Sequence, residues 1–143
     1  FQAVGLRDFS PRILVDALQT LASNPAAGAL EQRAILRSAV QVALFAGPPH
    51  DQEEWLDVLR DAMCVIARFA SEAAGDSDGE ASVDVLRATR HAAGLLGGHS
   101  AYHPAQLLRV ICDTLREAQE ERVLAEGLDA LESIVGVGGW NPH

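Results

Sequence analysis

The stretch AGLLGGHSAYHP, residues 93–104, gathers three glycines and two histidines into twelve residues. A phosphate-binding loop with this many glycines would follow a strand, lead into a helix and carry a lysine. Here the residues before the glycines have helical spacing, and the whole chain contains no lysine. We therefore interpret Gly97 and Gly98 as the end of one helix, with glycine in the left-handed conformation. His103 and Pro104 then begin the next helix, because proline suits the first helical turn.

Similar signals divide the rest of the chain into helices. Ser10 with Pro11, and Asp51 with Glu54, have the residue types of helix starts, and glycines follow the second and last helical patterns. The six predicted helices pair into three antiparallel hairpins, with a polar loop inside the second hairpin. The hairpins span residues 10–47, 51–97 and 103–139, and the polar loop spans residues 74–82.

Apolar residues recur every three or four positions in each helix, which predicts the side that faces the core. The pattern is clearest between Asp51 and Ala73, where Trp55 begins the apolar face. Cys64 and Cys112 lie among apolar neighbours, so we expect both thiols to be unpaired and buried. The predicted core faces are Trp55, Leu59, Ala62, Met63, Ile66 and Phe69; Leu14, Leu18 and Leu21; Ala34, Ile35, Ala39, Val40 and Ala43; Val83, Leu86, Ala93 and Leu96; Leu107, Leu108, Ile111, Leu115 and Ala118; and Leu124, Leu128, Leu131 and Val135.

Length and composition predict one all-α domain over residues 1–143. Hydrophobic residues make up 48% of the chain, which is enough for a core, and strand-favouring aromatic residues make up only 5%. The net charge is −9, with residues 51–143 carrying 17 acids and 7 arginines. Such a surface repels nucleic acid and anionic membranes. No apolar run is long enough to span a membrane, and the expected location is the cytoplasm.

The chemistry-bearing residues match no catalytic or metal-binding pattern. His91, His99 and His103 lack the ligand spacing of zinc sites, and the acidic stretch DSDGEASVD, residues 76–84, fails as a calcium loop because Val85 would occupy the position of the bidentate glutamate. No nucleophile lies near a base in the sequence, although a cysteine and a histidine could still meet in space. We therefore expect no catalytic residue, no metal and no cofactor.

The hairpins recur with a regular spacing. Their starts are 41 and 52 residues apart, and the glycines at the ends of their second helices, Gly47, Gly97 and Gly138, are 50 and 41 apart. Both spacings come near 41 once about ten residues around the polar loop are set aside. This period resembles that of HEAT and armadillo arrays, which implies a short α-solenoid. A compact six-helix bundle is the alternative, because the same hairpins could also close on themselves.

The resemblance implies a non-catalytic protein–protein interaction or scaffold module. In HEAT and armadillo arrays the second helix of each hairpin lines the concave face, so Arg33, Arg37, Arg87 and His91 are the expected partner-binding residues. Arginine pairs with carboxylates, which favours an acidic peptide or helix as the partner. A solvated surface without a partner is the plainer interpretation. The alternative functions are a homo-oligomeric helical bundle with a regulatory or ligand-binding role and, third, an enzyme whose site the sequence does not reveal.

Overall fold

A computed structural model describes residues 11–45, 53–71, 79–97, 103–116 and 118–137 of the chain. These residues form six helices and no strand, which confirms the predicted all-α fold. The helices are α1 (Pro11–Ala22), α2 (Ala29–Phe45), α3 (Glu53–Phe69), α4 (Glu80–Leu96), α5 (Pro104–Leu115) and α6 (Glu121–Val137).

The helix starts follow the sequence signals where the structure describes them. His103 is the N-cap of α5 and Pro104 its first residue, as predicted. Helix α4 begins at Glu80, inside the stretch predicted as a polar loop, because Gly79 takes a left-handed conformation and turns the chain into the helix. The predicted caps at Ser10 and Asp51 lie outside the described residues.

The helix ends differ from the prediction in two places. Helix α3 ends at Phe69 rather than at Ala73. Helix α4 ends before Gly97 as predicted, but Gly97 has a φ of −57° and is not left-handed. Its N–H still donates to the carbonyl oxygen of Ala93 at 3.1 Å, so an ordinary helical hydrogen bond satisfies this end. Gly98 lies outside the described residues.

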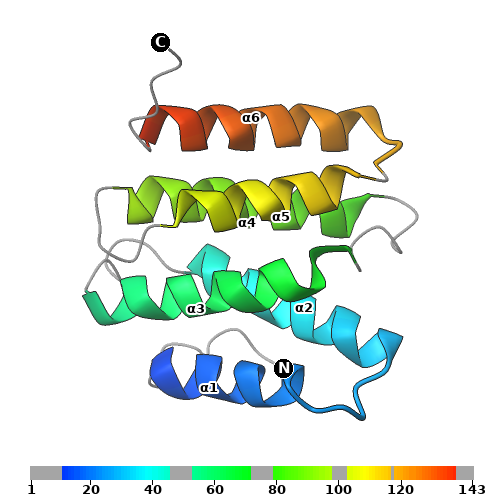
Figure 1. The fold of residues 1–143 in the computed structure, drawn as a ribbon, viewed down its shortest axis with the longest axis vertical. Helices are drawn as coiled ribbons and strands as arrows, with labels where there is room; N and C mark the ends of the chain where they lie inside the picture. The colour runs from blue at the N-terminus through cyan, green and yellow to red at the C-terminus, as the bar shows by residue number, and fades with distance from the viewer. Residues whose placement is uncertain (1–10, 46–52, 72–78, 98–102, 117, 138–143) are drawn as a thin grey trace.

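The helices stack as hairpins from one end of the molecule to the other (Figure 1). Helices α1, α3 and α5 form one row and α2, α4 and α6 a second row, with neighbours in each row packed together. Among the described residues, no extensive contact joins the first hairpin to the third. The stack is therefore open, with α1 at one end and α6 at the other.

The core lies mainly in the middle hairpin. The predicted face of α3 is buried throughout, from Trp55 to Phe69, and the Trp55 ring packs against Phe45 with 5.7 Å between centroids. Helix α4 is buried on most of its circumference because it contacts α2, α3, α5 and α6. Its buried Thr89 hydroxyl donates to the Val85 carbonyl oxygen at 2.8 Å, so the core leaves this group satisfied.

Helix α6 packs through a different face from the predicted one. Leu124, Leu128, Leu131 and Val135 are exposed. The buried face instead includes the small residues Gly127 and Ala130, with Val123 and Ile134. A Cβ atom on Gly127 would lie 2.6 Å from Leu115 Cδ1, so glycine lets α6 approach α5 closely.

Smaller corrections of the same kind apply to three other helices. Leu21 of α1 is exposed, and its neighbour Ala22 is buried instead. Ala34 of α2 and Leu108 of α5 are also exposed. In each helix the apolar residues cover more of the circumference than the neighbouring helices do, so those at the edge of the stripe stay in solvent.

The predicted burial of the cysteines is wrong. Cys64 and Cys112 are both free, as predicted, but both are exposed. Cys64 lies between buried Met63 and Val65 in the sequence, yet its own position on α3 faces away from the core. Apolar sequence neighbours do not bury a residue when the helix turns it by 100° from them.

Candidate protein-binding surfaces

A groove between α2 and α4 contains two of the four predicted partner-binding residues. Its volume is about 460 Å³, and it is lined by Leu44 of α2 and by Arg87, Arg90, His91, Gly94 and Leu95 of α4. Arg33 and Arg37 lie on α2 but do not line this groove; Arg33 is half-buried and Arg37 is exposed. The structure therefore brings Arg87 and His91 together with apolar side chains.

The polar residues of α4 face those of α6. The Arg87 Nε donates to Glu126 Oε1 at 3.4 Å. Two further ion pairs join these helices, between Arg90 and Asp129 and between Arg122 and Glu80, each at 3.7 Å. The Arg90–Asp129 and Arg122–Glu80 pairs are exposed on both sides and contribute little to stability, typically below about 1 kcal/mol. The Glu126 side chain is only 18% exposed, so an acidic ligand at Arg87 would compete with a largely buried carboxylate for the guanidinium.

A second groove, between α3 and α5, was not predicted from the sequence. Its volume is about 730 Å³, and Arg68, Arg109 and Arg116 line it together with Cys64 and Gln106. The Gln106 side-chain amide donates to Cys64 Sγ at 3.2 Å. Arg68 and Arg109 are 41 residues apart in the sequence. The 41-residue spacing of the hairpins could therefore have predicted that these two arginines line the same groove.

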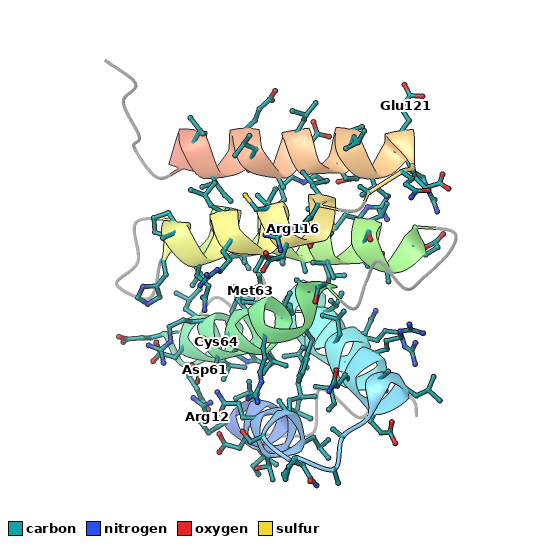
Figure 2. The ribbon with its side chains drawn as sticks, turned by 45° about the vertical axis from the view of Figure 1, so that its right-hand side comes forward. Arg12, Asp61, Met63, Cys64, Arg116 and Glu121 are labelled. Carbon is teal, nitrogen blue, oxygen red and sulfur yellow. The ribbon has the colours of Figure 1, made fainter. Side chains whose placement is uncertain are left out.

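The contact between α1 and α3 is an ion pair rather than a binding site. The Arg12 guanidinium donates to Asp61 Oδ2 at 2.6 Å, where α1 meets α3 (Figure 2). This hydrogen bond, followed by the nearby charges of Asp61 and Asp16, raises the pKa of Arg12 above its ordinary value. The contribution of Arg12 to stability is fully present below the ordinary pKa of arginine and is lost as the pH rises through the raised pKa, in strongly alkaline solution.

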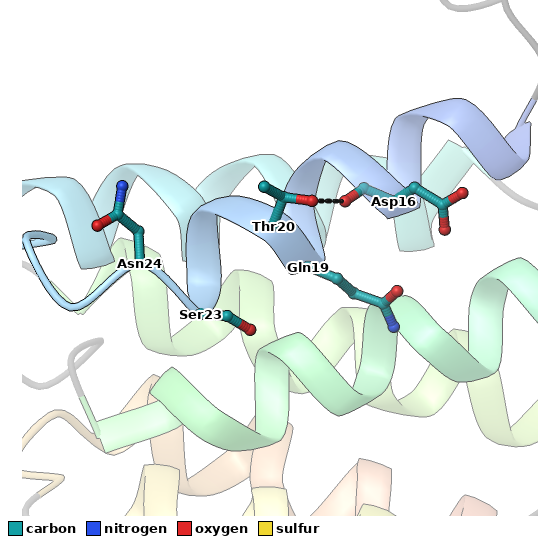
Figure 3. A pocket seen from close by; sticks show the side chains of 5 residues that line it. All are labelled: Asp16, Gln19, Thr20, Ser23 and Asn24. Carbon is teal, nitrogen blue, oxygen red and sulfur yellow. Dashed lines mark hydrogen bonds between the residues drawn. The ribbon is translucent and has the colours of Figure 1, made fainter.

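A polar depression lies along α1 and just beyond its end (Figure 3). Two of its residues make local hydrogen bonds within this segment. The Thr20 hydroxyl donates to the Asp16 carbonyl oxygen at 2.9 Å, and Asn24 Oδ1 accepts from the Ala26 N–H at 2.9 Å. The remaining lining residues are Gln19 and Ser23. Because all of them come from one segment, the depression is a helix surface and not a cleft between elements.

The titratable residues do not assemble into a metal site in the described part of the chain, where no three histidine, cysteine or acidic side chains come close enough to share an ion. His91 is half-buried on α4, and His103 is exposed at the start of α5. His99 and residues 76–78 of the acidic stretch lie outside the described residues, whereas residues 80–84 form the first part of α4.

Exposed large apolar side chains gather at the two ends of the stack. Helix α6 carries four of them, and the others lie on α1, α2 and α5. None lies on α3 or α4 as far as the structure describes these helices. The residues are Ile13, Leu21, Leu30, Leu108, Leu124, Leu128, Leu131 and Val135.

Comparison with known proteins finds no match among family models, curated proteins or solved structures. Of the described helices, none has the length and apolar character needed to cross a bilayer. The surfaces of the stack are therefore the basis on which a function can be proposed.

Proposed function

We propose that the chain is a non-catalytic protein–protein interaction module of the helical-repeat type, similar to HEAT and armadillo arrays. The observation that carries this proposal is the open stack, in which each hairpin packs extensively only on its neighbour. Proteins built in this way present long, continuous side surfaces that bind partners. The two free, exposed thiols fit a reducing compartment, the cytosol.

The proposed ligand is an acidic amphipathic peptide or helix on the row of second helices. In the α2–α4 groove, Leu44 and Leu95 supply apolar contacts, and Arg87 and His91 supply polar ones. Arg33 and Arg37 extend the polar surface along α2. This combination suits a ligand with an apolar side and carboxylates beside it, because arginine pairs bidentately with carboxylates.

The overall negative charge of the protein means that an acidic ligand can bind only through local contacts to arginines. A net charge of −9 repels an acidic partner at long range. Binding therefore depends on short-range contacts to Arg37 and Arg87. Raising the ionic strength weakens these contacts and also screens the repulsion, so we expect only a shallow salt dependence.

The test is a double charge reversal, Arg37→Glu with Arg87→Glu, measured by fluorescence anisotropy with a labelled Glu- and Leu-rich amphipathic peptide. The matched control, Arg109→Glu with Arg116→Glu, changes the charge equally in the α3–α5 groove. We expect the first variant to bind about tenfold more weakly, or about 1.4 kcal/mol, and the control to bind within about threefold of wild type.

Circular dichroism establishes that both variants are folded. If the folded Arg37→Glu, Arg87→Glu variant binds as tightly as wild type, the second-helix row is not the docking surface. An equal loss in both variants would show that binding follows total charge and would also overturn the proposal.

A homo-oligomeric role remains the second candidate function. The exposed apolar residues at both ends of the stack favour it, because such patches mark association surfaces.

A further inference from the structure

The exposed apolar residues at each end of the stack are aligned along a helix. On α6, Leu124, Leu128, Leu131 and Val135 follow one another at intervals of 4, 3 and 4 positions. This spacing places them in one line along the helix, as in the seam of a coiled coil. Leu128, near the middle of the line, is 61% exposed.

Helix α1 carries a shorter line at the opposite end. Ile13 and Leu21 are 62% and 52% exposed, and the exposed Ala17 lies between them at four-residue intervals. Leu30, at the start of the adjacent helix α2, is also exposed. Both ends of the molecule thus present aligned apolar side chains to solvent.

The middle of the stack shows what normally covers such surfaces. Helix α3 packs between α1 and α5, and α4 packs between α2 and α6. Among the described elements, the four outer helices α1, α2, α5 and α6 have a row neighbour on one side only, and α1 and α6 lie farthest apart (Figure 1). An outer face of a helical array that meets only solvent is generally polar, which keeps the array soluble and separate. The described outer faces of α1 and α6 carry apolar lines instead.

The charges at the two ends of the stack indicate which surface packs against the apolar line of α6. Helix α6 has four acidic residues and one arginine. Glu126 and Asp129 pair with Arg87 and Arg90 of α4, while Glu121 and Glu132 are exposed on the same helix. Two α6 helices packed together would therefore bring the exposed glutamates of both copies close to one another. Helix α1 has one acid and one arginine, Asp16 and Arg12, which already pair with each other at 3.1 Å. Helix α2, beside it, has two arginines, Arg33 and Arg37, and one acid. An acidic α6 is thus better matched to the first hairpin than to another α6.

We propose that a second copy of this chain covers the α6 line with its own first hairpin, so that molecules associate head to tail. The apolar line of α6 packs against Ile13, Ala17 and Leu21 of α1 in the next molecule. Such an interface joins two different surfaces, so every complex keeps one free α1 end and one free α6 end, to which further copies can add, unless a ring closes. The α3–α5 groove on the side of the stack stays open. Arg33 and Arg37 also belong to the proposed peptide-docking surface, so the association of copies is measured without peptide.

The first measurement is sedimentation velocity of the wild-type chain over a range of concentrations. We expect the average mass to rise continuously beyond that of a dimer. The proposal is overturned if the mass equals that of the 15.2 kDa monomer at every concentration up to about 1 mM. In that case a different protein, and not a second copy of this chain, would be expected to cover the end faces.

The decisive experiment mixes two variants, each with one altered end. One variant carries Leu128→Glu and Leu131→Glu on α6; the other carries Ile13→Glu and Leu21→Glu on α1. All four positions are exposed, so the fold tolerates the changes. Each variant alone should be monomeric, because its altered end cannot pair with any copy of itself. Together, the intact α6 of one should bind the intact α1 of the other and give a 1:1 dimer that grows no further.

A symmetric α6–α6 dimer predicts the opposite pattern. The α1 variant would then dimerise by itself, and the mixture would contain no heterodimer. Either result would overturn the head-to-tail arrangement. The control is Ala105→Glu, which adds one acid at an exposed position of α5 in the α3–α5 groove and should leave the mass distribution of the wild type unchanged.

Discussion

Gly79 holds a position that other residues fill poorly. It has a φ of 75°, and every other described residue has a negative φ. A Cβ atom there would lie 3.1 Å from Val123 Cγ2 and 3.2 Å from Glu120 Cγ. The left-handed conformation and the close approach of α6 therefore both favour glycine at the start of α4.

This gives a matched prediction for two glycines at opposite ends of one helix. Gly79→Ala should lower the free energy of unfolding by about 1–2 kcal/mol, because alanine is strained at positive φ. Gly94→Ala should raise it by up to about 1 kcal/mol, because Gly94 lies within α4 and a Cβ there meets nothing within 4 Å. Urea denaturation followed by circular dichroism measures both, and a shift in the same direction for both variants would contradict this account.

The two cysteines supply a second prediction at the residue scale. Cys64 and Cys112 are exposed, so both thiols should react with a chromogenic disulfide reagent in the native protein nearly as fast as in denaturant. Alanine variants at each position assign the reaction to one thiol or the other. Slow labelling of either thiol, at a rate limited by unfolding, would show that it is protected in the folded chain.

At the scale of the element, α6 presents two apolar faces with different roles. Ile134 is buried, and Leu128 is exposed on the same helix. Ile134→Ala should lower the free energy of unfolding by about 2–4 kcal/mol, because it removes buried methyl groups and leaves a cavity. Leu128→Ala should change it by less than about 0.5 kcal/mol.

These two variants are compared at low protein concentration, so that association of the chain does not contribute to stability. Equal losses for both would mean that the leucine line is packed within the molecule. A larger loss of unfolding free energy for Leu128→Ala would show that the face predicted from the sequence is the packed one.

At the scale of the whole molecule, the open stack predicts uneven stability. Helices α3 and α4 have packed neighbours in both directions along their rows, whereas α1 and α6 have a described row neighbour on one side only. We therefore expect amide hydrogen exchange to be slowest in α3 and α4 and faster in α1 and α6, because local opening needs fewer contacts to break at the ends. Mass spectrometry of peptic fragments measures this, and uniform protection across all six helices would indicate a closed cooperative unit.

Some features of this protein follow from the sequence alone. The number and order of the helices, the start of α5 at Pro104 and the buried face of α3 were all predicted correctly. These features depend on interactions between residues a few positions apart, such as helical hydrogen bonds, capping and the repeat of apolar side chains. Local sequence contains all the information that they require.

Other features were decided only by the tertiary structure. Leu128 and Gly127 are adjacent, yet contact with Leu115 of α5 selects the glycine for the interface and leaves the leucine in solvent. The α3–α5 groove and the pairing of Arg87 with Glu126 likewise join residues about forty positions apart. When the apolar stripe of a helix is wider than the area that neighbouring helices cover, the sequence does not specify which residues of the stripe are buried. The shape of the opposing helix specifies it, because closely packed helices need small residues where their backbones approach.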